Sequence, residues 1–198
     1  MPARNNGMAN YGKALIRIER RPSVVVGIGG VTIGGANPVA LQSMTNTDTM
    51  DTEACVAQIG RIREAGCLIV RLTAPGKREG ENLKNIKQQA VASGLGDMAL
   101  VADIHFTPDV AMIAAEYVDK VRINPGNYKD GAGEKFAQLV GKCRQRGVAL
   151  RIGVNHGSLA PHIVEKLGDT PRGMVESAME FLRECRRLNF DQVVVSMK

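Results

Sequence analysis

Short apolar runs alternate with longer amphipathic stretches along most of the chain. The runs are four to six residues long and apolar almost throughout, rather than alternately apolar and polar. This pattern is typical of parallel strands that are covered on both faces. The predicted strands are 39–44, 68–72, 98–102, 120–123, 149–154 and 192–197.

The segments between the strands have the spacing of helices. In residues 134–146, Phe136, Leu139, Val140 and Cys143 recur at offsets of three, four and seven, which places them on one helix face. A Thr-Pro pair, typical of a helix start, occurs twice. We predict five helices, among them 52–65, one that starts at Thr107-Pro108, 134–146, and one from Thr170-Pro171 to about Leu188.

The order of these elements predicts an α/β fold of the (β/α)8 TIM-barrel type, truncated after about six strands. Strand starts recur about every 30 residues, close to the repeat of such barrels. Before the first strand, residues 24–35 form two short apolar runs around Gly29-Gly30, which predicts a β-hairpin that closes the barrel bottom. A doubly wound open sheet is the alternative, but no G-x-G-x-x-G follows the first strand.

The composition limits the classes of ligand that the protein is expected to bind. The formal net charge is +6, yet no basic block of the length of a nucleic-acid-binding tail occurs, which favours small anions. No apolar stretch reaches the roughly 18 residues of a membrane-spanning helix. Residues 1–10 are polar and unlike a signal peptide. We expect a cytoplasmic protein in which residues 1–20 are a disordered leader and 21–198 form the partial barrel.

The four cysteines show no metal-binding spacing. Cys55, Cys67, Cys143 and Cys185 form no C-x-x-C pair, and three of them lie at apolar positions of predicted helices. We interpret them as buried thiols of a reducing compartment and predict no metal site from these residues.

Basic side chains gather at the predicted strand ends, where βα folds place their function. Arg71, Arg122 and Arg151 each lie between apolar neighbours, and Lys198 ends the sixth strand. The two-residue period of a strand turns these arginines away from the apolar wall, toward the barrel lumen or the rim of the pocket. Converging cations repel unless an anion lies among them, and Arg suits bidentate phosphate contacts. Pairing with acids is the structural alternative, although Asp103 is the only clear acid at these ends.

Asp103 and His105 are the candidate catalytic pair. They are two residues apart and face the same side of an extended segment. They could form an oriented base or part of a metal site, and a structural ion pair is equally compatible with the sequence. His156 and His162 are expected in a loop region, in contact with solvent or behind the site.

Five segments of the chain form a recognisable set of motifs. They are 40–47 (ALQSMTNT), 101–106 (VADIHF), 121–127 (VRINPGN), 150–155 (LRIGVN) and 189–192 (NFDQ). Together, and in this order, they resemble the 4-hydroxy-3-methylbut-2-enyl diphosphate synthase family. The resemblance extends from about residue 20 to 198, and residues 71–74, 81–87 and 127–128 look like the family's longer form.

The resemblance implies an enzyme of the non-mevalonate isoprenoid pathway. Its reaction is the two-electron opening and dehydroxylation of 2-C-methyl-D-erythritol 2,4-cyclodiphosphate to 4-hydroxy-3-methylbut-2-enyl diphosphate. By position, Arg122, Arg151 and Lys198 resemble the diphosphate clamp, and Arg71 is a weaker match. Further pocket residues implied by the resemblance are Asp103, His105, Asn124 and Asn155.

The resemblance also implies a cofactor and partners. A [4Fe-4S] cluster is expected in the complete protein, on a C-terminal domain whose ligands are not in this chain, so the fragment alone is expected to be inactive. Ferredoxin or flavodoxin would supply electrons, and the complete protein would be a homodimer. Two alternatives stay open: a pterin-binding barrel like that of dihydropteroate synthase, and a non-catalytic phosphate-binding module.

Overall fold

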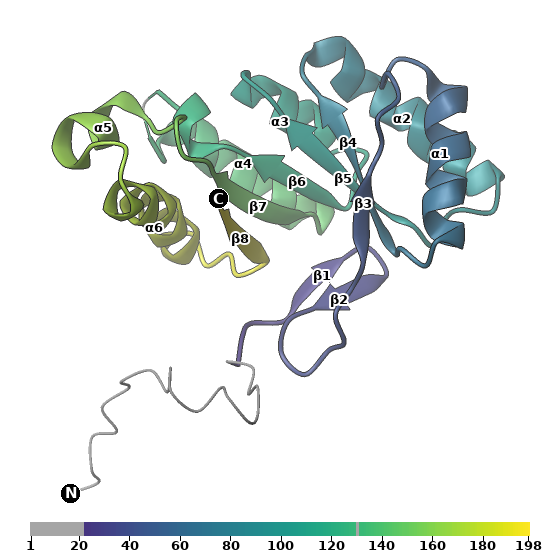
Figure 1. Cartoon of the computed structure of the whole chain (residues 1–198), viewed down its shortest axis with the longest axis horizontal. Coiled ribbons are helices and arrows are strands. Elements are labelled where there is room, and N and C mark those ends of the chain that lie inside the picture. Colours follow the sequence, from purple (N-terminus) through teal and green to yellow (C-terminus); the bar gives the residue numbers. More distant parts are fainter. Residues whose placement is uncertain (1–21, 130) are drawn as a thin grey trace, which may run out of the picture.

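The computed structural model describes residues 22–129 and 131–198, so the predicted leader 1–20 lies outside the described residues. Six parallel strands, hydrogen-bonded in sequence order, form one sheet that curls into part of a barrel (Figure 1). The predicted α/β barrel architecture is confirmed. The strands are β3 (Gln42–Met44), β4 (Ile69–Ala74), β5 (Ala99–Ile104), β6 (Lys120–Ile123), β7 (Ala149–Val154) and β8 (Val193–Met197).

The predicted strands β6 and β7 have the observed bounds, whereas β3 is shorter than predicted. Val39 and Leu41, which the sequence placed inside this strand, are exposed. The strand β3 pairs with β4 alone and forms one edge of the sheet, so its first residues lack a second neighbour. Pattern alone could not reveal this, because an apolar run looks the same at an edge and in the centre.

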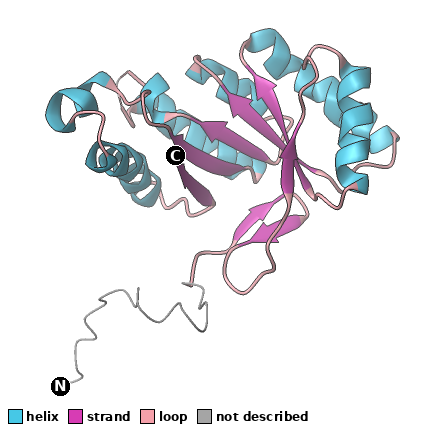
Figure 2. Ribbon diagram, in the orientation of Figure 1, coloured by secondary structure: helices cyan, strands magenta, loops and turns pink. Residues whose placement is uncertain are grey.

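Helices cover the outer face of the curled sheet (Figure 2). The outward side chains of the strands and the inward faces of the helices form one large apolar core. Within the described residues there are six α-helices: α1 (Thr52–Glu64), α2 (Lys77–Ala92), α3 (Pro108–Ala114), α4 (Glu134–Arg146), α5 (Pro161–Leu167) and α6 (Pro171–Arg187). A 3-10 turn, η2 (Pro125–Asn127), follows β6.

The short helix α5 corrects the prediction that His162 lies in a loop. Pro161 occupies the first turn, and Gly168 ends the helix with a positive φ of 66°. His162 Nε2 lies 2.8 Å from Glu180 Oε2 on α6. Seven residues are too few for a helical stripe to stand out in the sequence. His156 does lie in a loop, as predicted.

The N-terminal hairpin closes the bottom of the sheet, which confirms that prediction. Its strands, β1 (Val26–Ile28) and β2 (Val31–Ile33), are antiparallel. A second apolar cluster joins the hairpin to the lumen, and Gly27 N donates to Gln192 Oε1 at 2.9 Å. This cluster contains Val26, Ile28, Val31, Ile69, Ala99, Val101 and Ala149.

None of the helices in the described ranges is both long enough and apolar enough to cross a bilayer.

The two edges of the sheet lead to a prediction about residues 1–198 expressed alone. Both β3 and β8 have a single neighbour, and Val195 and Met197 of β8 are 42% and 43% exposed. Apolar edge strands pair readily with other chains. We therefore expect the isolated chain to be oligomeric or poorly soluble in size-exclusion chromatography with light scattering. A monodisperse monomer with a sharp cooperative melt would contradict this expectation.

Candidate functional site

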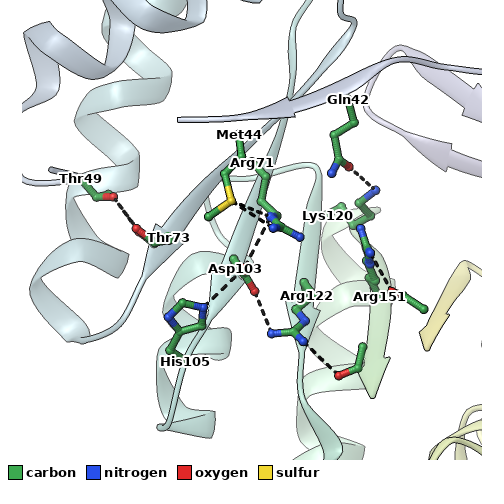
Figure 3. Close-up of polar contacts among 12 residues, drawn as sticks. Gln42, Met44, Thr49, Arg71, Thr73, Asp103, His105, Lys120, Arg122 and Arg151 are labelled. Atoms are coloured by element: carbon green, nitrogen blue, oxygen red, sulfur yellow. Dashed lines mark hydrogen bonds and ion pairs between the residues drawn. The ribbon is translucent and has the colours of Figure 1, made fainter. Parts of the chain in front are cut away.

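The register of the central strands brings the predicted cations together. Asp103 on β5 lies opposite Arg122 on β6, and Arg122 lies opposite Arg151 on β7. Paired residues of parallel strands point to the same face of the sheet. Figure 3 shows these side chains together with Arg71 of β4, all on the lumen side. This arrangement agrees with the prediction that three arginines converge on one part of the barrel.

Asp103 is the acid that contacts most of these side chains. This carboxylate is buried, and its Oδ1 accepts a hydrogen bond from Arg122 Nη1 at 3.1 Å. Its Oδ2 lies 3.4 Å from Arg71 Nε and 3.5 Å from His105 Nε2 (Figure 3). The pairing of arginine with acid, which the sequence left open, therefore occurs for Arg71 and Arg122. One carboxylate serves both arginines.

Arg122 lies in a tightly defined position. Its Nη2 donates to the carbonyl oxygen of Gly153 on β7 at 3.1 Å. A Cβ atom at position 153 would lie 2.4 Å from Arg122 Nε, so glycine leaves the space that this side chain fills. With the amide oxygen of Asn155 turned toward it, Arg122 Nη2 also donates to that oxygen at 3.2 Å. Asn155 therefore orients Arg122 in the lumen.

Arg151 has no carboxylate within ion-pair distance among the described residues. Its Nη2 donates to Ser196 Oγ on β8 at 2.8 Å, while its Nε is buried and has no hydrogen-bond partner in the described part of the chain. Burial, then the neighbouring Arg71 and Arg122, lower the pKa of Arg151, and Asp103 opposes them. The lumen thus carries more positive charge than its acid neutralises.

Asn124, predicted as a pocket residue, uses its side chain to hold two loops. Its Oδ1 accepts from Gly126 N at 3.0 Å, and its Nδ2 donates to Ser158 Oγ at 2.9 Å. The first contact caps the turn η2, and the second ties it to the loop after β7. Both amide atoms are therefore engaged within the protein.

Lys198 directly follows β8, and its side chain is exposed. Its backbone N–H donates to the carbonyl oxygen of Val154 at 3.2 Å, and its own carbonyl oxygen accepts from His156 N at 2.9 Å. These bonds place Lys198 beside the end of β7, the strand that carries Arg151. The side chain is available at the rim.

The contact between these two loops leads to a second prediction. A Cβ atom on Gly126 would lie 1.7 Å from the backbone oxygen of Ser158, so Gly126→Ala forces the loops apart. We expect a loss of about 1–3 kcal/mol of unfolding free energy in denaturant titrations of the complete protein. Gly30→Ala is the matched control, since a Cβ there meets nothing within 4 Å and the position lies outside the helices. Equal stability of the two variants would show that the loops do not need this close approach.

Lys120 is the lumen residue that the sequence reasoning missed. It begins β6, it is 2% exposed, and its Nζ donates to Gln42 Oε1 at 3.3 Å (Figure 3). The signal was present, because Lys120 precedes Arg122 by two residues and the strand period turns both to the same face.

Three of the four cysteines are buried thiols, as predicted, whereas Cys67 is only partly buried. Cys55, Cys143 and Cys185 lie in the apolar core, and burial raises the pKa of both Cys143 and Cys185 to about 12. Across the described ranges, no three His, Cys, Asp or Glu side chains gather closely enough to hold a metal ion. The described residues do not fit an iron–sulfur cluster, and we assign no cluster ligand to them.

Comparison with known proteins agrees with the motifs. Residues 23–198 match the model of the GcpE TIM-barrel domain family. The chain is 50% identical over 204 residues to 4-hydroxy-3-methylbut-2-en-1-yl diphosphate synthase (flavodoxin) of Phocaeicola vulgatus, covering 93% of this chain and 33% of the relative. It is 45% identical over 207 residues to the enzyme of the same name from Leptospira interrogans, covering 95% and 31%. The chain thus spans about a third of the length of these relatives.

Solved structures show the same fold at low sequence identity. A truncated 3-deoxy-D-arabino-heptulosonate 7-phosphate synthase from Thermotoga maritima matches with a TM-score of 0.58 and 17% identity, over 87% of this chain and 56% of that one. The 7,8-dihydropteroate synthase of Vibrio fischeri matches with a TM-score of 0.56 and 11% identity, over 87% and 66%. At such identity the likeness shows the fold alone. It therefore lends no functional support to the pterin-binding alternative.

Proposed function

Because this chain belongs to the GcpE TIM-barrel domain family, we propose that it is the diphosphate-binding barrel of a 4-hydroxy-3-methylbut-2-enyl diphosphate synthase. The substrate would be 2-C-methyl-D-erythritol 2,4-cyclodiphosphate, which two electrons open and dehydroxylate. One observation carries the proposal: among the described residues, Arg71, Arg122 and Arg151 share a lumen with a single buried carboxylate. Such an excess of positive charge is complementary to a diphosphate.

The proposed clamp consists of Arg122, Arg151 and Lys198, which come from successive strands. Arginine forms two parallel hydrogen bonds with phosphate oxygens, so Arg122 and Arg151 would set the orientation of the diphosphate. Lys198 would add a charge from the rim. Arg71 is proposed to support the clamp through Asp103, its neighbour at 3.4 Å.

Asp103 and His105 are proposed to act as a pair. His105 is partly exposed, and its Nε2 is directed to Asp103 Oδ2 at 3.5 Å. A carboxylate in this position orients an imidazole. His105 would then face the bound substrate, while Asn155 and Asn124 keep Arg122 and the surrounding loops in place.

The cofactor and partners belong to the proposal for the complete protein. A [4Fe-4S] cluster would supply the electrons to the substrate when bound, from ligands that we do not assign to this chain. The names of the relatives specify flavodoxin, which favours flavodoxin over ferredoxin as the donor. We further propose a cytoplasmic homodimer.

The clamp is tested by Arg122→Ala and Arg151→Ala in the complete protein. Charge-assisted hydrogen bonds contribute about 1.5–3 kcal/mol each, so each change should weaken binding of the cyclodiphosphate about 10- to 100-fold in calorimetry. Arg→Lys at either site should also weaken it, because a point charge cannot form the bidentate contact. Arg63→Ala removes an arginine whose partner is Asp97 on the outer surface, and it should leave the affinity unchanged.

Circular dichroism separates binding from folding in this series. Unchanged affinity in both lumen variants would return these arginines to a structural role. Loss of folding in both would do the same, since an anion clamp is not required by an empty barrel.

A further inference from the structure

Lys120 has a neutral partner in a charged environment. Its ammonium group donates to the amide oxygen of Gln42, 78 residues away in the sequence. In the part of the chain that the structure describes, no carboxylate lies within ion-pair distance of it. A buried lysine of this kind bears the full cost of losing its hydration without the compensation that an ion pair supplies.

The charged side chains that act on Lys120 are those of arginines. Asp103, the buried acid of this lumen, is already paired with Arg71 and Arg122. The hairpin below contributes apolar side chains to the lumen. Taken strand by strand, the groups around Lys120 are Gln42 on β3, Arg71 on β4, Val101 on β5, Arg122 on its own strand, and Ala149 and Arg151 on β7.

Like charges nearby and burial act in the same direction. Burial first, then Arg151 and Arg71, lower the pKa of Lys120 from 10.5 to about 8. Arginine side chains in general stay charged far above neutral pH. Lys120, in contrast, is a lumen cation whose charge can change near neutral pH.

We propose that Lys120 is an adjustable cation of the anion site, which takes up a proton when a diphosphate binds among the arginines. The proposal rests on the proposed function and extends it to a residue outside the clamp. A bound dianion offsets the positive potential of Arg71 and Arg151, and the amine then binds a proton from solvent more tightly. By linkage, the protonated amine in turn strengthens the binding of the dianion.

Calorimetry at pH 8.5, in buffers of different ionisation enthalpy, measures the proton count directly. The ligand is 2-C-methyl-D-erythritol 2,4-cyclodiphosphate, whose diester phosphates have no proton to exchange near this pH. We expect the wild-type complete protein to take up about half a proton for each ligand bound. Lys120→Met should abolish the uptake and weaken binding at pH 7 about tenfold.

Two further variants separate the charge from the packing. Lys120→Arg carries a permanent charge, so it should bind tightly without proton uptake, and its affinity should stay constant above pH 8 where that of the wild type falls. Lys87→Met removes a lysine that is paired with Asp119 on the outside, and it should behave as the wild type does.

The outcomes separate the two proposals. Tight binding by the wild type without proton uptake would overturn the role of Lys120 and leave the diphosphate site intact. Uptake that persists in a folded Lys120→Met variant would also overturn it. If the cyclodiphosphate does not bind the wild type at all, the proposed function is wrong and the inference about Lys120 falls with it.

Discussion

Asp103→Ala is expected to cost about 3–5 kcal/mol of unfolding free energy in the complete protein, the largest loss of any single change considered. Asp103 is buried and faces Arg71, Arg122 and His105 within 3.5 Å. Alanine leaves these groups without an acid while the arginines stay buried or half-buried. Denaturant titration followed by circular dichroism measures the loss.

Two further variants show whether the loss of stability in Asp103→Ala comes from the missing buried charge. Asp103→Asn keeps the shape and one acceptor oxygen, so it should destabilise less than alanine does. Asp97→Ala removes an acid that pairs with Arg63 on the open surface, where an ion pair contributes little, and it should leave the midpoint nearly unchanged. If Asp103→Ala were as stable as Asp97→Ala, the idea of Asp103 as the central counter-charge of the lumen would be wrong.

Lys120→Met is expected to stabilise the protein at neutral pH. A pKa lowered from 10.5 to about 8 corresponds to a cost of about 3 kcal/mol for holding the charge in the folded state. Methionine has a similar shape and no charge. The gain, measured by denaturant titration at pH 7 without ligand, should approach this magnitude, while the same variant binds the diphosphate less well.

The pH dependence of this gain gives the stricter test. Below about pH 8 Lys120 is charged in both states, so the folded state bears the whole cost and methionine gains most. Between about pH 8 and 10.5 the unfolded chain binds more protons than the folded one, and wild-type stability rises with pH. The advantage of methionine should therefore shrink over this window. A difference that stays constant from pH 7 to 10 would show that packing, and not charge, is responsible.

Much of the architecture could be predicted from the sequence. The apolar runs located β6 and β7 with their observed bounds, and the helical stripe located α4 in the same way. These elements are central, and burial on both sides leaves a strong pattern. The sequence pattern made the edge strand β3 too long and did not reveal the seven-residue helix α5. The boundaries of both elements depend on their neighbours in the fold rather than on the local pattern.

For the site, the sequence by itself determined that Arg71, Arg122 and Arg151 lie on the face opposite their apolar neighbours, because side chains alternate along a strand. The motifs determined the family. Only the tertiary structure decided the pairing: Asp103 serves two arginines, Asn124 binds neighbouring loops, and Lys120 has an amide as its partner. The physical reason is that charge balance in the lumen depends on strand register and side-chain reach between residues far apart in the chain. The local sequence specifies neither of these.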